Sequence, residues 1–141
     1  MRILYYATLF LLFSNRLIAQ KLEDNLIVVT ITDTTKLYER VRQAITFTDL
    51  IIREDSKRDT LITYSARIYN KSIFVVAKVT ISGNQVKISG AYGLGLEDFW
   101  GYPAWPKSYK RALYFKGSEA WQVLRSIAIK LDSKIEFTRI D

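Results

Sequence analysis

The sequence predicts an α+β fold, a curved and largely antiparallel sheet of five to six strands with two helices packed on one face. Several short runs alternate apolar and polar residues at the period of two that half-buried strands show, and two other runs repeat apolar residues at the helical period of 3.6. The strand-like runs follow one another with the helical runs set apart, which is typical of an antiparallel sheet rather than a doubly wound parallel one. The expected order is strand, helix, four strands, a long aromatic loop, helix and strand.

The first strand and the first helix are expected between residues 26 and 48. The run NLIVVTITD places Ile27, Val29 and Ile31 on one face, as a half-buried strand requires. Thr34 or Thr35 can cap the helix that follows, because a side-chain oxygen there accepts from a free amide of the first turn. The apolar face of this helix recurs at helical spacing and consists of Leu37, Val41, Ala44, Ile45 and Thr48.

Three further strands are expected before the hairpin turn. Residues 50–53 form a short strand, and the charged run at 54–59 forms a solvated turn. Strands at residues 60–69 and 72–81 follow, and the second has the clearest alternation in the chain. Its apolar face comprises Ile73, Val75, Ala77, Val79 and Ile81.

A tight hairpin and a second helix complete the pattern. Gly83 and Asn84 separate two strands in a two-residue turn, where glycine permits the positive backbone angle that the turn demands, and the returning strand includes residues 86–88. The last strand covers residues 134–140. Ser118 can cap the second helix, whose apolar face is Trp121, Leu124, Ile127, Ala128 and Leu131.

Residues 1–19 are expected to be a cleaved signal peptide, which leaves residues 20–141 as a single domain. Arg2 gives a positive start, an apolar run follows, and the stretch ends in the small residue Ala19, so that Gln20 becomes the first residue. A retained membrane anchor is the alternative, but it requires about 20 apolar residues, roughly twice this run. The pattern therefore predicts an exported protein, periplasmic or secreted, with no stable membrane span after signal removal.

The chain contains no cysteine and no histidine. Thiolate catalysis, thiolate metal sites and triads that use histidine are thereby excluded. Carboxylate, lysine or tyrosine chemistry is still possible, but no phosphate-binding loop, calcium loop or zinc helix is present. We therefore predict no catalytic residue, no metal ligand and no cofactor.

The net charge favours anionic partners. The formal charge is +7, and removal of Arg2 and Arg16 with the signal leaves 19 basic and 14 acidic residues, a charge of +5. Such an excess suits acidic polysaccharide, cell-wall polymer or membrane headgroups, although an ordinary soluble surface can carry it too. For an exported protein we expect no nucleic-acid partner.

The segment at residues 91–116 is the candidate site, because it is longer than most structureless loops and rich in aromatic residues. Two interpretations are open: Trp100 and Trp105 stack on a glycan or apolar ligand, or these rings cover the open end of the core. Their exposure would separate the two. The candidate residues for binding a ligand or partner are Tyr92, Phe99, Trp100, Tyr102, Trp105, Lys107, Lys110 and Arg111.

Three functional hypotheses follow from this pattern. The first is a non-enzymatic exported domain that interacts with an envelope or secreted protein, or with itself. The alternative is a module that binds a glycan or another small ligand, including an apolar one. The remote alternative is a carboxylate-dependent hydrolase, in which Glu97 or Asp98 would need Glu119 or Asp132 within about 10 Å.

Three short sequences carry a resemblance to a known group of proteins. They are IAQ at the end of the signal, KLYERVRQAI in the first helix, and DTLITYSAR before a long strand and a Gly-Asn hairpin. In layout the chain resembles small exported domains of unknown function from Bacteroidota-type bacteria, over about residues 26–89 and the last helix. The resemblance implies a TBP-like or helix-grip arrangement and an exported location, and it transfers no catalytic residues.

Overall fold

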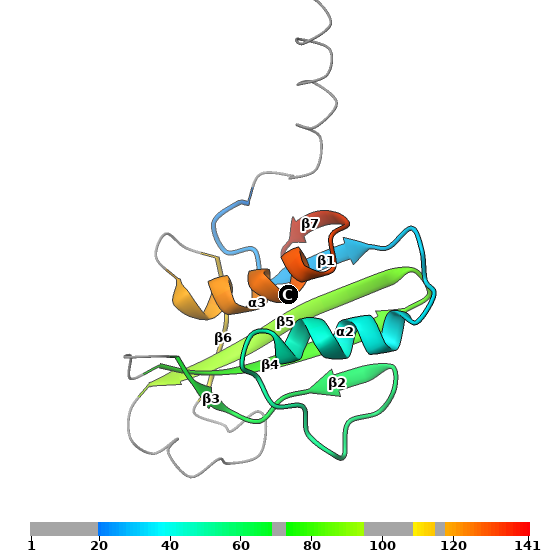
Figure 1. The fold of residues 1–141 in the computed structure, drawn as a ribbon. Coiled ribbons are helices and arrows are strands. Elements are labelled where there is room, and N and C mark those ends of the chain that lie inside the picture. The colour runs from blue at the N-terminus through cyan, green and yellow to red at the C-terminus, as the bar shows by residue number, and fades with distance from the viewer. Residues whose placement is uncertain (1–19, 69–72, 95–108, 115–117) are drawn as a thin grey trace, which may run out of the picture.

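The computed structural model describes residues 20–68, 73–94, 109–114 and 118–141. It confirms the α+β class: an open, mostly antiparallel sheet with two helices in front of one face (Figure 1). Neither helix has the length and apolar character needed to cross a membrane. The elements are β1 (Leu26–Thr30), α2 (Leu37–Thr46), β2 (Thr60–Ile62), β3 (Ala66–Arg67), β4 (Ile73–Ser82), β5 (Gln85–Leu94), β6 (Lys110–Arg111), α3 (Glu119–Lys130) and β7 (Lys134–Thr138).

The hairpin of β4 and β5 forms the centre of the sheet. The strand order is β2-β4-β5-β1-β7, with β3 paired to β4 and β6 paired to β5. Gly83 has φ of 59° in the two-residue turn, so the expected hairpin is confirmed, and the ladder runs from Ser82 opposite Gln85 to Ile73 opposite Leu94. The strand that begins after the turn is therefore longer than residues 86–88.

The core lies between the sheet and the helices and contains the apolar faces expected from the alternation. Ile27 and Val29 of β1 are buried, as are the apolar positions of α2. Trp121 of α3 is 1% exposed, and its ring centroid lies 6.3 Å from that of Tyr114 and 6.2 Å from that of Phe137. Such tilted aromatic pairs add to the stabilisation that burial alone provides.

The position of α3 depends on its cap and on a glycine beneath it. The Ser118 hydroxyl accepts from the Trp121 amide at 3.3 Å, which confirms the expected cap. A Cβ on Gly90 of β5 would lie 2.7 Å from the Val76 carbonyl oxygen and 2.8 Å from both methyl carbons of Leu124. The helix can approach the sheet this closely because residue 90 has no side chain.

The predicted threonine cap of α2 is wrong. The residue before the helix is Lys36, with φ of 51°, and no side chain in the described part of the chain caps the first turn. Thr35 instead donates its amide to the Asp33 carboxylate at 2.9 Å. Aspartate binds the amide two residues along in this way and stabilises a turn, so the helix begins later than the sequence predicts.

Residues 50–53 do not form the expected strand. Within the described residues they make one isolated bridge, between Ile52 and Thr63, and Arg53 donates its amide to the Ile62 carbonyl at 2.8 Å. The expected strand at 60–69 is likewise divided into β2 and β3. The Thr63 hydroxyl accepts from the Ala77 amide at 2.9 Å, so a side chain replaces part of the backbone ladder there.

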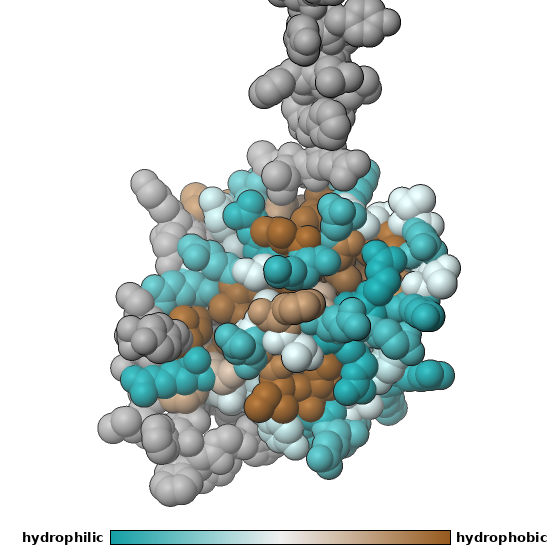
Figure 2. All heavy atoms as spheres, in the orientation of Figure 1, coloured by the Kyte–Doolittle hydropathy of each residue, from teal (hydrophilic) through white to brown (hydrophobic). Residues whose placement is uncertain are grey.

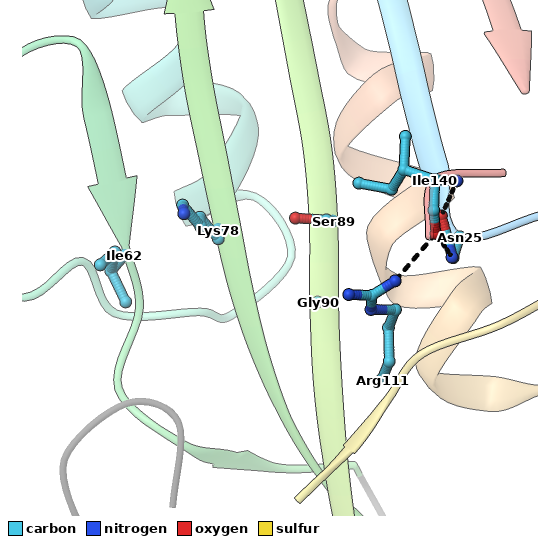
Figure 3. A pocket seen from close by; sticks show the side chains of 7 residues that line it. All are labelled: Asn25, Ile62, Lys78, Ser89, Gly90, Arg111 and Ile140. Atoms are coloured by element: carbon cyan, nitrogen blue, oxygen red, sulfur yellow. Dashed lines mark hydrogen bonds between the residues drawn. The ribbon is translucent and has the colours of Figure 1, made fainter. Parts of the chain in front are cut away.

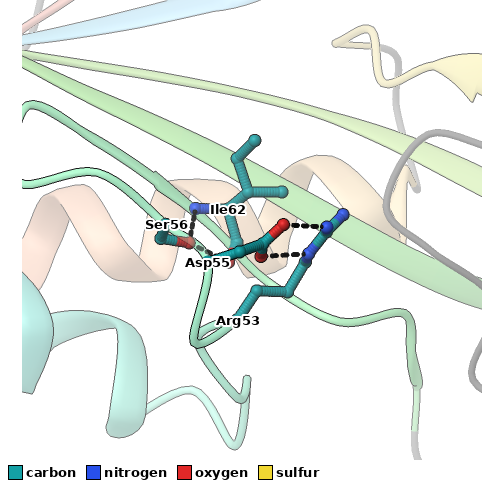
Figure 4. Close-up of polar contacts among 4 residues, drawn as sticks. All are labelled: Arg53, Asp55, Ser56 and Ile62. Atoms are coloured by element: carbon teal, nitrogen blue, oxygen red, sulfur yellow. Dashed lines mark hydrogen bonds and ion pairs between the residues drawn. The ribbon is translucent and has the colours of Figure 1, made fainter.

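The charged turn at residues 54–59 is fixed to β2 by Ser56. Its hydroxyl donates to the Ile62 carbonyl and accepts from the Ile62 amide, both at 3.0 Å (Figure 4). Arg53 forms a bidentate pair with the exposed carboxylate of Asp55, and this hydrogen-bonded pair lowers the pKa of Asp55 and raises that of Arg53. The turn therefore helps to hold Ile62 in place.

Candidate functional site

The sheet face opposite the helices carries a pocket of about 380 Å³ (Figure 3). Six strands or strand ends contribute to it, so it lies across the sheet rather than at one loop. The described residues that line it are Asn25, Ile62, Lys78, Ser89, Gly90, Arg111 and Ile140.

Sheet register places the first side of the pocket. Lys78 on β4 lies directly between Ile62 on β2 and Ser89 on β5. Directly opposed residues point to the same face of a sheet, and these three therefore form a row on the face without helices. Apolar, cationic and hydroxyl groups are adjacent within that row.

The second side of the pocket is built from three distant parts of the chain. Arg111 on β6 donates to the backbone carbonyl of Ile140 at 2.9 Å. The Asn25 amide group also donates to that carbonyl, at 2.7 Å, and its oxygen accepts from the Ile140 amide at 2.8 Å. Asn25 is only 3% exposed, and its two hydrogen bonds hold the backbone of Ile140 in place. The Ile140 carbonyl is therefore a fixed acceptor for Arg111.

The pocket presents hydrogen-bond donors and positive charge. Within the described residues, Arg111 makes no hydrogen bond besides the one to Ile140, and the Lys78 ammonium and the Ser89 hydroxyl make none. The described lining contains no carboxylate. Guanidinium and ammonium groups that point into a partly apolar recess suit the binding of an acceptor-rich ligand.

Metal binding has no comparable support in this part of the molecule. Across the described ranges, no three acidic side chains come together in a way that could hold a metal ion. For the hydrolase hypothesis, Glu119 begins α3 and Asp132 is exposed after it, whereas Glu97 and Asp98 lie outside the described residues.

The structure places three of the sequence-predicted site residues. Tyr92 of β5 packs half-buried against the helix-side core, opposite Val75 and Lys110. Arg111 lies opposite Ala91, and successive side chains of a strand point to opposite faces, so Arg111 faces the pocket and Tyr92 the core. The other predicted residues lie outside the described part of the chain: Phe99, Trp100, Tyr102, Trp105 and Lys107.

Most of the pocket residues carry little signal in the sequence. The available signal was Lys78, a cation within the apolar run IFVVAKVTI, together with the hairpin register that places Ser89 opposite it. The approach of Asn25 and Ile140 to Arg111 has no sequence signal, because it depends on how three separate segments pack.

No protein-family model matches the chain, and a search of the curated proteins finds no match. The resemblance to exported domains of TBP-like or helix-grip layout stays an expectation. Function is therefore inferred from the pocket itself.

Proposed function

We propose that this chain is an exported, non-enzymatic binding domain whose small-ligand site is the pocket described above. This pocket lies on the sheet face opposite the helices, which we call the open face. The observation that carries the proposal is a recess of about 380 Å³ in which polar donors and two isoleucines converge. Ligand sites in proteins commonly measure roughly 300–1,000 Å³ and combine apolar walls with a few well-placed polar groups.

The division of roles follows from the side chains. Ile62 and Ile140 provide apolar contact, while the Ser89 hydroxyl can bond polar groups of a ligand. Arg111 is already oriented by the Ile140 carbonyl, so less side-chain entropy is lost when a ligand binds. These features suit a glycan unit or another hydroxylated small molecule.

An NMR titration of the ¹⁵N-labelled protein with glycan fragments and fatty acids tests the proposal. We expect a ligand to shift the amide signals of Ser89 and Gly90 first. Ser89→Tyr should fill the pocket and abolish these shifts, whereas Thr30→Tyr, on the same face but at the other end of β1, should leave them unchanged. Ligand shifts confined to other surfaces, or retained in Ser89→Tyr, would refute the pocket as the site.

A protein partner is the second candidate, because apolar side chains are exposed on the helix-covered side. Phe47, after α2, is 71% exposed and Ile51 is 68% exposed. Figure 2 shows several apolar areas on this side, separated by hydrophilic residues. If this surface binds an envelope protein or a second copy, the Phe47→Ser/Ile51→Ser variant will lose the complex in sedimentation experiments, whereas Ser89→Tyr will retain it.

A further inference from the structure

We infer that the ligand of the open-face pocket is an anion, bound by Arg111 through a carboxylate or phosphate group with Lys78 as the second cation. This inference rests on the proposed function and specifies the chemical class of the ligand. Its first support is the balance of charge: two cations and no carboxylate are present among the described residues that line the pocket.

The second support is the fixed position of Arg111. One of its terminal nitrogens donates to the Ile140 carbonyl, and Figure 3 shows the guanidinium reaching from β6 toward Gly90 on β5. The remaining N–H groups are available within the described residues. A guanidinium binds two oxygens of a carboxylate or phosphate at once, and its charge strengthens both hydrogen bonds.

The third support is the placement of Lys78 across β5 from Arg111. The register sets their Cα atoms two strand spacings apart and two residues along the sheet, which corresponds to about 12 Å. Both side chains are long, and the lysine stem is flexible. An anionic ligand placed over Ser89 therefore lies between two positive charges, and its hydroxyl groups can bond the serine.

The residues that fix Arg111 indicate that the arrangement is specific. Asn25 is buried and uses both its amide nitrogen and its oxygen to hold the Ile140 backbone, which in turn orients the guanidinium. An arginine that only increased solubility would need no such support. We therefore place Asn25 as a positioning residue for the pocket.

Four simple probes test the inference: D-glucuronate, D-glucose 6-phosphate, inorganic phosphate and neutral D-glucose. Each is titrated into the ¹⁵N-labelled full chain, and the dissociation constant is taken from the shifts of Ser89 and Gly90. At least one anion should bind about tenfold or more tightly than glucose, and high salt should weaken it. Glucuronate binding alone would indicate a carboxylate ligand, and binding of either phosphate probe alone a phosphate ligand.

Matched variants identify the side chains responsible. Arg111→Gln should weaken the preferred anion about tenfold or more, since a charged hydrogen-bond donor is removed. Lys78→Gln should weaken it severalfold. Arg42→Gln and Lys130→Gln lower the net charge equally on the helix side and should change the affinity less than twofold. A dispersed amide spectrum will show that each variant is folded.

The outcomes separate the inference from the proposed function. If glucose binds at Ser89 as tightly as the anions and Arg111→Gln has no effect, the anion inference fails while the pocket remains a ligand site. If Arg42→Gln weakens the anions as much as Arg111→Gln does, general attraction to a basic protein replaces specific binding. If no probe shifts the pocket signals at tens of millimolar concentration, both are overturned.

Discussion

At the scale of single residues, Gly90 shows how the two faces of the sheet are linked. On the helix side its missing side chain admits Leu124, and on the open side its backbone lines the pocket. Its carbonyl also accepts from the Ala112 amide at 2.9 Å, directly after β6. The same residue therefore sets the depth of α3 and the position of the strand that carries Arg111.

We expect Gly90→Ala to lower the free energy of unfolding by about 1–3 kcal/mol, because the new methyl group overpacks the contact between α3 and β5. Urea unfolding measures this change. Leu124→Ala will itself be destabilising, but in the Gly90→Ala background it should cost less than in the wild type, since it relieves part of the clash. Simple additivity of the two changes would contradict this explanation.

Thr63 offers a second test at this scale. It is fully buried, and its hydroxyl accepts from the Ala77 amide. Thr63→Val keeps the shape but leaves that amide without its partner, and a buried unpaired group costs about 1–3 kcal/mol. Thr63→Ser keeps the oxygen and should be the more stable variant in urea unfolding. A valine variant as stable as the serine variant would show that the hydrogen bond contributes little.

At the scale of the elements, α3 begins where its serine cap predicts. Ser118→Ala should destabilise the protein by about 1 kcal/mol, because the Trp121 amide loses its acceptor. Ser126→Ala is the matched control, since Ser126 is exposed within the helix and its one hydrogen bond among the described residues is to the carbonyl of Gln122, four residues earlier. Alanine favours a helix interior, so this variant should be as stable as the wild type or slightly more stable. If Ser118→Ala and Ser126→Ala lower the melting temperature equally, the Ser118 cap does not stabilise the helix.

How far the sequence predicts the elements depends on the kind of signal. The long strands and both helices were predictable because burial imposes a period along at least four residues, as in β1 and β4. The two-residue strand β6 has no period to detect, and its Lys110 and Arg111 are both exposed. The pocket was missed for the same reason, because Arg111 acquires its role from β6 pairing with β5 beside Asn25.

At the scale of the whole molecule, acid stability should depend on two exposed aspartates. Hydrogen bonds from the side chain and amide of Thr35 lower the pKa of Asp33 below its ordinary value of 3.8, and the pair with Arg53 lowers that of Asp55. A carboxyl whose pKa falls on folding stabilises the protein above its unfolded pKa. That stabilisation is lost as the pH falls through the folded value.

Comparison of the wild type with the Asp33→Asn/Asp55→Asn variant checks this dependence. The variant should be slightly less stable at pH 6, and the difference should fade as the pH is lowered from about 4 toward 2. Urea unfolding at a series of pH values measures it. A difference that grows on acidification would contradict the assigned direction. Because the chain has no histidine, no imidazole titration will obscure the comparison near neutral pH.

The junction of Asn25, Arg111 and Ile140 has a thermodynamic consequence. Its hydrogen bonds join residues that are 115 and 29 positions apart in the chain, so the pocket exists only when β1, β6 and the end of β7 have assembled. A ligand that needs this junction cannot bind the unfolded chain. Binding therefore stabilises the fold by an amount that grows with ligand concentration, and this reaches about 2.7 kcal/mol at one hundred times the dissociation constant. A compound that binds at this junction should therefore raise the melting temperature of the protein.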